Sequence, residues 1–242
     1  MCGIFYDFHI HSALSPCADD DMTPNNIVNM AVLKGLDVIA LTDHNSCGNC
    51  RSVMEVGKEK GLLVIPGMEL CTSEECHVLC LFSSLDGALE FEKQVKKSIT
   101  PIKNNPQIYG QQLLMDSMDN VIGVEDSLLL TASGISASYV SKMARDFSGV
   151  AIPAHIDRNS YSIISQLGFI TEDMDFNTLE ISLDCNIDRL IETYEYLKRY
   201  QFITDSDAHN LGQISEPVNQ LNIKDCDKKN ITAKNVINIL YY

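Results

Sequence analysis

The stretch GIFYDFHIHS, residues 3–12, decides the fold that this sequence predicts. Residues 3–11 are expected to form a buried first strand, and its two histidines, His9 and His11, stand at the strand's end. Side chains two residues apart on a strand point to the same face, so both imidazoles can bind one cation together. The opening of the chain therefore indicates both a strand and the start of a metal site.

Short apolar runs alternate with amphipathic segments along the rest of the chain. Further strands are expected over residues 36–41, 62–65, 77–82, 149–153, 178–181 and 202–204, and helices over 24–34, 50–60, 87–97, 187–199 and 233–240. Strands that alternate with helices predict an α/β fold with a mostly parallel sheet, either open or closed into a barrel. Residues 100–147 differ, because their prolines and glycine precede two expected helices. We interpret them as an inserted helical segment that either shapes the substrate pocket or only covers the sheet.

The composition narrows the classes of protein to consider. The 242 residues can form one large α/β domain or two small ones, and the formal net charge of -15 argues against a protein that tracks nucleic acid through a basic surface. The sequence has no apolar run near 18 residues and no basic and apolar N-terminal region typical of a signal peptide. Nine cysteines without framework spacing suggest reduced thiols. We therefore expect a cytoplasmic protein without membrane contact.

The six histidines of the chain all lie at the edges of predicted strands. They are His9, His11, His44, His77, His155 and His209. Five of them lie at C-terminal strand ends, the rim where barrel and doubly wound folds place their chemistry. A lone histidine is more often a satisfied core or surface residue, but six of six beside acids indicate a multinuclear metal site. Histidine and carboxylate ligands together suit zinc, manganese or iron better than calcium or magnesium.

Two carboxylates fit this metal site by their positions. Glu69 follows the third expected strand, where it could bridge two cations. Asp207 shares a face with His209 if the chain stays extended, and it could bind the cation held by His9 and His11. Both carboxylates are therefore candidate metal ligands.

The remaining acids near the histidines leave alternatives open. Asp7 and Asp43 suit orientation of an imidazole as well as direct ligation. In the acid run at residues 19–21, a solvated turn and a metal ligand are equally good interpretations of any single residue. The CxxC motif at residues 47–50 has no second CxxC, so we expect a helix start with two reduced thiols there.

The histidine motifs, taken in order, resemble those of the polymerase and histidinol phosphatase (PHP) family. The matching residues are Asp7-x-His9-x-His11-Ser12, Thr42-Asp43-His44, Pro66-Gly67-x-Glu69, His77, Ala154-His155 and Ser206-Asp207-x-His209. The resemblance spans residues 5–210, so residues 1–242 are expected to be a single PHP domain with residues 100–147 as an insertion or cap. It implies a distorted, TIM-like (β/α) barrel of seven strands with two or three divalent metals at its C-terminal rim.

The resemblance also implies how the ligands are shared among the metals. One metal would have His9, His11, Glu69 and Asp207, a second Glu69, His77 and His155, and a third His44, His209 and a residue of the loop after the first strand. This loop, residues 14–21, replaces the family's short Ser-Asp-Gly turn. Counting back from Pro24 favours Asp19 as the third-site ligand, with Asp20 close behind and Cys17 also within reach.

The function implied is that of a metal-dependent phosphoesterase, a phosphoric ester hydrolase. A hydroxide bridging the metals would attack the phosphorus of a small phosphorylated metabolite or nucleotide, and Glu69 and Asp207 would act in catalysis as ligands. Arg158, three residues past His155, is the candidate for a bidentate phosphate clamp. The alternative is a surface arginine paired with an acid such as Asp157, and Arg51 is a weaker second candidate for the clamp.

Three other functions fit the sequence less well than a phosphoesterase does. An exonuclease or a polymerase-associated nuclease would carry a basic stripe or an appended nucleic-acid module, so nucleic acid is the less favoured partner. A metal-stabilised binding module without turnover would lack some of the ligands, whereas every histidine motif is intact here. An amidohydrolase also begins with HxH but would lack the motifs at residues 42–44 and 66–69. The sequence leaves open which ester is hydrolysed, which metals are bound and the oligomeric state.

Overall fold

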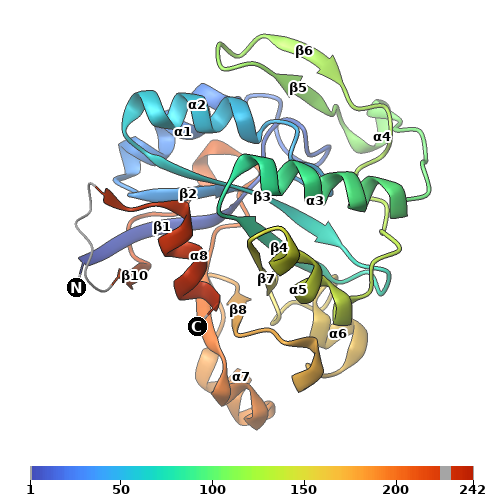
Figure 1. Cartoon of the computed structure of the whole chain (residues 1–242), viewed down its shortest axis with the longest axis vertical. Coiled ribbons are helices and arrows are strands. Elements are labelled where there is room, and N and C mark those ends of the chain that lie inside the picture. The colour runs from blue at the N-terminus through green and yellow to red at the C-terminus, as the bar shows by residue number, and fades with distance from the viewer. Residues whose placement is uncertain (1, 224–229, 242) are drawn as a thin grey trace.

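Seven strands, five in one sheet and two in a separate pair, follow a curled course back toward the first strand in the computed structural model, which describes residues 2–223 and 230–241 (Figure 1). These strands are β1 (Cys2–Ile10), β2 (Val38–Leu41), β3 (Leu63–Cys71), β4 (His77–Phe82), β7 (Gly149–Pro153), β8 (Thr178–Ile181) and β9 (Gln201–Thr204). β1, β2, β3, β4 and β7 are neighbours in that order, and the β8–β9 pair returns to β1 through a bridge between Ile10 and Ala208. The predicted α/β fold built around a distorted barrel is confirmed.

β4 runs antiparallel to its two neighbours, and this direction brings a residue of the site into place. β1, β2 and β3 run parallel, as do β8 and β9, but β4 runs antiparallel to both β3 and β7. Only residues 72–76 connect β3 to β4, which is too short for the crossover that a parallel pair needs. The N-terminal end of β4 therefore lies at the same rim as the C-terminal ends of its neighbours, and this brings His77 to that rim.

The two expected helices near the N-terminus form where the sequence predicts them. They are α1 (Pro24–Lys34) and α2 (Cys50–Lys60). The Thr23 hydroxyl accepts a hydrogen bond from the Asn26 N–H, Pro24 needs no N–H partner in the first turn, and Gly35 ends α1 at φ 79°. Local capping chemistry therefore fixes the bounds of α1.

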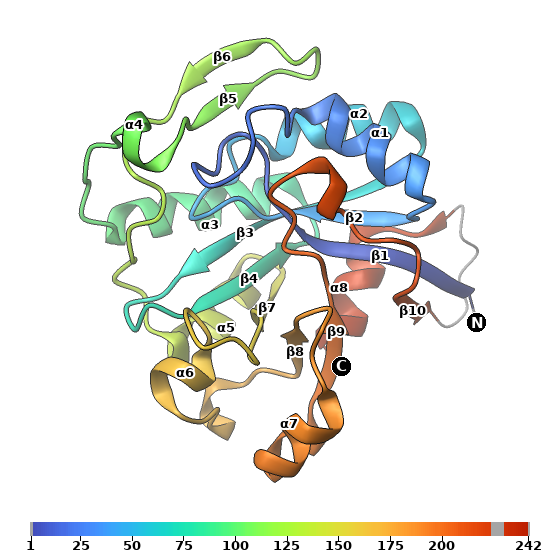
Figure 2. The same ribbon diagram turned by 180° about the vertical axis from the view of Figure 1, so that it is seen from behind.

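Helices cover both faces of the curled sheet. The remaining helical elements are α3 (Leu85–Ser98), α4 (Pro106–Tyr109), α5 (Ala137–Asp146), α6 (Ile163–Leu167), η1 (Glu172–Met174), α7 (Ile187–Thr193), η2 (Glu195–Arg199), η3 (Leu211–Gln213) and α8 (Ala233–Tyr241). One apolar core joins the sheet to α1, α2, α3 and α5, and a second joins its other face to α8 and to β10 (Gln220–Ile223), which pairs with the start of β1 (Figures 1 and 2). None of the described helices has the length and apolar character needed to cross a membrane.

Residues 100–147 contain a β-hairpin that the sequence analysis did not anticipate. Its strands, β5 (Leu113–Met115) and β6 (Val121–Val124), are antiparallel and lie outside the α2–α3 layer (Figures 1 and 2). One Asp116 carboxylate oxygen accepts the N–H groups of Met118 and Asn120, both at 2.9 Å, so a local side-chain turn replaces the first expected helix. The Leu113 N–H donates to the Ala13 carbonyl at 2.8 Å, which fastens the hairpin to the loop after β1.

Gly110 lies close against the loop after β1. It has φ 100°, and a Cβ atom there would stand 2.0 Å from the Pro16 carbonyl oxygen. We expect Gly110→Ala to lower the free energy of unfolding by about 1–3 kcal/mol, because it adds both backbone strain and a steric clash. Urea denaturation measures the effect. Gly123→Ala, whose Cβ would meet Leu114 at an ordinary 3.5 Å, is the matched control and should change stability little; equal losses in both variants would contradict this interpretation.

Candidate metal centre

A single buried carboxylate, Glu69, lies at the centre of the histidine cluster. Its side chain is 1% exposed, and five imidazoles reach it. Glu69 Oε1 lies 3.2 Å from His9 Nε2, 2.9 Å from His77 Nδ1 and 3.2 Å from His155 Nε2, and Oε2 lies 2.8 Å from His44 Nδ1 and 3.6 Å from His11 Nε2. The burial of Glu69 opposes ionisation, but the surrounding imidazoles, His77 first, lower its pKa well below the ordinary value. Charge compensation therefore dominates this site.

Pairing with β4 explains how Glu69 reaches the cluster. The sequence predicts Glu69 just past the third strand, but β3 continues to Cys71 because its second half pairs with β4, where Glu69 faces Leu79. β2 has already ended at Leu41, and beyond it an isolated β-bridge pairs His44 with Glu69. The longer strand thus places Glu69 beside residues that follow β2.

Glu180 on β8 orients His9 and was not anticipated from the sequence. Its carboxylate is 1% exposed and lies 2.9 Å from His9 Nδ1. A carboxylate can only accept there, so the His9 Nδ1 carries the hydrogen and Nε2 presents its lone pair to Glu69 and Asp207. Glu180 also accepts the His155 backbone N–H at 3.0 Å. One buried acid thus positions two residues of the cluster.

Ser15 and Asp43 orient His11 in the same way. The Ser15 hydroxyl donates to Asp43 Oδ1 at 2.7 Å, so it accepts from His11 Nδ1 at 2.9 Å and leaves Nε2 free. Asp43 therefore acts on His11 through Ser15. Asp7, the other acid with an open role, instead accepts backbone N–H groups of Ser206 at 3.1 Å and Ser215 at 2.9 Å, and so joins β1 to the segment after β9.

The donor set fits divalent cations. The Nε2 atoms of His9 and His11 are 3.2 Å apart, and two nitrogens on one tetrahedral zinc ion would be about 3.3 Å apart. His44 Nδ1 and Glu69 Oε2 are buried without a partner of hydrogen-bond geometry. Three groups of possible ligands lie with their atoms within 4.8 Å of one another: His11, His44 and His209; His9, His11 and Glu69; and His44, Glu69 and His77.

Without a cation, protons must balance the charge in this cluster. The burial of His44 favours its neutral form, yet Glu69 and Cys17 raise its pKa to about 10. A cation binding to His44 near neutral pH would therefore displace a proton, as is usual for histidine ligands. Asp207 shows the complementary effect, because the imidazoles of His9 and His11 outweigh burial and lower its pKa below the ordinary range.

Asp207 and Arg158 lie together at the mouth of the cluster. Asp207 Oδ1 is 3.2 Å from the Nε2 atoms of both His9 and His11, and Oδ2 is 2.5 Å from Arg158 Nη1. Arg158 Nε also donates to Ser182 at 3.3 Å, and its side chain is 42% exposed. The structure therefore brings Arg158 to the site, paired with Asp207, while its role there remains a prediction.

The loop after β1 places Cys17, as well as Asp19, next to His209. Cys17 Sγ lies 3.1 Å from His209 Nε2. Asp19 reaches His209 through its main chain, with its N–H donating to the His209 carbonyl at 2.9 Å, and the side chains of both Cys17 and Asp19 are exposed. Of these two candidate ligands, Cys17 is the one whose side chain contacts an imidazole of the cluster.

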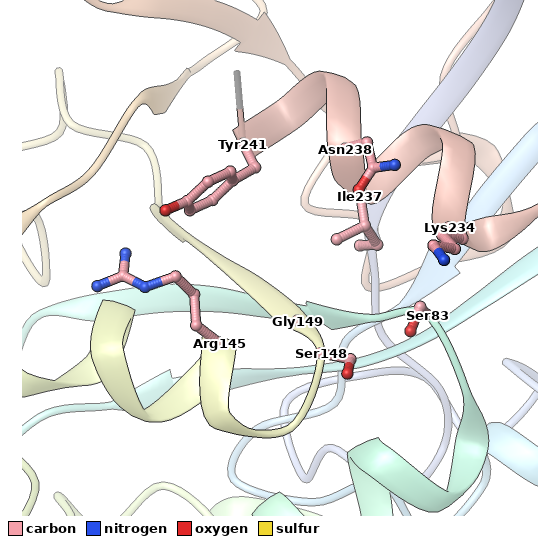
Figure 3. A pocket seen from close by; sticks show the side chains of 8 residues that line it. All are labelled: Ser83, Arg145, Ser148, Gly149, Lys234, Ile237, Asn238 and Tyr241. Atoms are coloured by element: carbon pink, nitrogen blue, oxygen red, sulfur yellow. The ribbon is translucent and has the colours of Figure 1, made fainter.

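A cavity of about 180 Å³ opens onto this centre. Its lining includes His44, His77, Arg158, Ser160, Tyr161 and Asp207. The Tyr161 ring stacks on His77 with centroids 4.7 Å apart and is 47% exposed, which makes it a pocket residue that no sequence motif indicated. A larger cavity of about 410 Å³ lies at the opposite ends of β4 and β7, beside Ser83, Gly149 and Tyr241, away from the histidines (Figure 3).

Arg51 and the CxxC motif lie away from the metal centre. Arg51 lines a third cavity together with Met54 and Leu62. Cys47 and Cys50 are buried at the start of α2, where both thiols approach the Gly67 carbonyl, at 3.3 and 3.4 Å. The motif thus serves the helix start and the core.

Comparison with known proteins points to one family. Residues 7–125 match the family described as "PHP domain". The chain is 32% identical over 100 residues to the uncharacterised protein MJ1587 of Methanocaldococcus jannaschii, covering 38% of this chain and 58% of that protein. It is 34% identical over 70 residues to a 5'-3' exoribonuclease of Haemophilus influenzae, covering 29% of this chain and 24% of the relative. The chain thus matches less than two thirds of the length of these relatives.

Solved structures share the fold over nearly the whole chain. The lesion-specific endonuclease PfuEndoQ of Pyrococcus furiosus superposes with a TM-score of 0.67 and 18% identity, covering 99% of this chain and 56% of that one. A protein assigned to the metal-dependent phosphoesterases from Bifidobacterium adolescentis gives 0.61 and 16%, covering 90% of this chain and 92% of that one. At these identities the likeness concerns the fold.

The contacts of Glu180 generate a test of its positioning role. We expect Glu180→Ala to weaken divalent-metal affinity by roughly 10–100-fold, because His9 loses the acceptor that directs its Nε2 toward the centre. Glu180→Gln keeps an acceptor oxygen and should lose less. Calorimetric titration with zinc measures both variants, with circular dichroism to verify the fold. Unchanged affinity in a folded Glu180→Ala variant would show that His9 needs no such support.

Proposed function

Residues 7–125 match the PHP domain family, and from this premise we propose that the chain is a metal-dependent phosphoesterase acting on small phosphate monoesters. The observation that carries the proposal is the convergence of six histidines with Glu69 and Asp207 at an open cavity that also holds an arginine. A surplus of imidazole ligands around a bridging carboxylate is typical of centres that hold more than one cation.

The residues proposed to hold the cations are those that the family resemblance implies, and the interatomic distances support this proposal. His9, His11, Glu69 and Asp207 would hold one, Glu69, His77 and His155 a second, and His44 and His209 a third, with a residue from the loop after β1, for which the sequence favours Asp19. Divalent cations at such a centre lower the pKa of a bound water toward neutrality and offset the negative charge of phosphoryl oxygens. The protein contributes a rigid donor set, oriented by Glu180 and Ser15.

Arg158 would hold the phosphoryl group of the substrate. Its guanidinium has five N–H donors, and the contacts with Asp207 and Ser182 use only part of them. These two contacts hold the side chain beside the cavity, and its remaining N–H groups would bind a phosphate. Asp207 would thus couple the cation site to the phosphate clamp.

The cavity and the charge of the chain favour a small substrate. A volume of about 180 Å³ is smaller than the roughly 300–1,000 Å³ typical of ligand pockets, so it suits a phosphoryl group with little else enclosed. The net charge of -15 opposes long polyanions. The exposed Tyr161 ring could contact the remainder of a metabolite or nucleotide outside the cavity.

A nuclease is the second candidate. The 5'-3' exoribonuclease of Haemophilus influenzae is 34% identical over the matched residues, and the endonuclease of Pyrococcus furiosus shares the fold over 99% of this chain. Hydrolysis of a phosphodiester needs the same cations and the same arginine. The two candidates therefore differ in which substrate the open side of the cavity would admit: a small phosphate monoester or a nucleic acid.

A substrate comparison separates these candidates. Purified protein loaded with manganese or zinc should release phosphate from p-nitrophenyl phosphate or nucleoside monophosphates. Glu69→Gln, which removes the shared carboxylate charge, should bring the rate to background and lower the metal content. Cleavage of oligonucleotides without hydrolysis of any monoester would favour the nuclease, and the absence of both activities in fully loaded protein would refute the proposal.

Arg158 provides a sharper test of the phosphate clamp. We expect Arg158→Ala to lower kcat/KM by roughly 10–100-fold, because a hydrogen bond to a charged group contributes about 1.5–3 kcal/mol. Arg51→Ala is the matched control, since Arg51 lies in a different cavity, and it should retain full activity. If both variants behave like the unmodified protein, Arg158 is a surface arginine that pairs with Asp207 and has no clamp role.

A further inference from the structure

The loop between β1 and α1, residues 11–23, is held against the metal centre by main-chain hydrogen bonds. The Asp19 N–H donates to the His209 carbonyl at 2.9 Å, and the Ala13 N–H donates to the Met22 carbonyl at 3.0 Å. Within the loop, the Ala18 N–H donates to the Ser15 carbonyl at 3.0 Å. These contacts fix the turn that carries Cys17, so its place beside the histidines is set by the backbone.

The Cys17 sulfur faces a nitrogen lone pair of His209. His209 Nδ1 lies 2.8 Å from the Asp207 carbonyl oxygen, which can only accept, so Nδ1 carries the hydrogen and Nε2 has the free lone pair. Cys17 Sγ is 3.1 Å from that Nε2. Two electron-pair donors this close require a proton or a cation between them. A tetrahedral zinc ion would set sulfur and nitrogen about 3.5 Å apart, so a small adjustment suffices.

His44 supplies an independent observation at the same place. Its side chain is buried, its Nδ1 faces Glu69 Oε2 at 2.8 Å, and the same side chain also contacts Cys17. His44, His209 and His11 bring ligand atoms within 4.8 Å of one another. Cys17 contacts both His44 and His209, so one thiol and two imidazoles meet at this place. A cation bound here would displace the thiol proton, because the thiolate is the form that ligates metals.

We propose that Cys17, His44 and His209 form the third cation site of the centre, with the Cys17 thiolate in the place for which the sequence favours Asp19. The proposal rests on the metal centre of the proposed function and makes the third site chemically distinct from the other two. A thiolate with two imidazoles selects a soft, tetrahedral cation such as zinc, whereas the mixed carboxylate and imidazole sites also accept manganese or iron.

Cobalt substitution tests this assignment directly. A cysteine thiolate bound to Co²⁺ gives an intense sulfur-to-metal charge-transfer absorption in the near ultraviolet, which carboxylate and imidazole ligands do not give. We expect this band in the cobalt-loaded protein and its loss in Cys17→Ser. The zinc content, measured by metal analysis, should fall from three equivalents in the unmodified protein to two in Cys17→Ser. Persistence of the band in Cys17→Ser, or only two equivalents in the unmodified protein, would overturn the proposal.

Two matched variants identify the ligand. Asp19→Asn should keep both the band and three equivalents, because the main chain of Asp19, and not its carboxylate, contacts His209. Cys185→Ser changes a partly exposed cysteine outside the centre and should also keep both. If Asp19→Asn loses one equivalent while Cys17→Ser keeps it, the ligand is Asp19.

Two further outcomes keep this proposal separable from the proposed function. If Cys17→Ser does not fold, Cys17→Asp replaces it and should retain three equivalents without the band. The band and the metal content are measured without turnover. Protein that shows the thiolate band and hydrolyses no ester refutes only the phosphoesterase function, and protein that hydrolyses esters with two metals and no band refutes only the role of Cys17.

Discussion

The rest of the structure depends on the burial of one negative charge, the carboxylate of Glu69, among five imidazoles. An isolated carboxylate would not stay ionised in such a place, so the chain must deliver compensating groups from several elements at once. β1, the ends of β2 and β7 and the start of β4 each provide at least one of them. Because β4 is antiparallel, its first residue, His77, reaches the same rim as residues that follow the other strands.

A second set of buried polar groups fixes how the imidazoles point. Glu180 and the pair of Ser15 and Asp43 determine which ring nitrogen of His9 and His11 carries the hydrogen, and so leave Nε2 of each ring toward the centre. The backbone is also held in an uncommon conformation here, with positive φ at His155 and Asp207. Such residues cost about 1–3 kcal/mol each and persist only where surrounding contacts enforce them. The geometry of the centre is thus maintained at the expense of stability, as expected of a binding site and not of a packing core.

The segment at residues 100–147 is joined by hydrogen bonds to the loop after β1 and to Asn45, the neighbour of His44. Asn45, which follows His44, donates to the Leu129 and Thr131 carbonyls at 2.7 and 2.9 Å and accepts the Cys71 N–H at 3.0 Å. The side chain therefore ties the inserted segment to β3 instead of capping α2 or facing the cavity. Asn45 thus connects the inserted segment to β3 and to His44, a candidate cation ligand.

The sequence by itself determined the α/β class, the bounds of α1 and α2, and the set of histidines with Glu69 and Asp207, because strand periodicity, capping residues and the spacing of motifs are local properties. Only the tertiary structure decided the antiparallel direction of β4, the hairpin within residues 100–147, and the contacts of Glu180, Tyr161 and Cys17 with the cluster. Glu180 stands in an apolar strand with no motif around it, and the sulfur of Cys17 reaches His209 across 192 positions of sequence. Contacts of this kind depend on how distant segments meet, and no local pattern of residues encodes that.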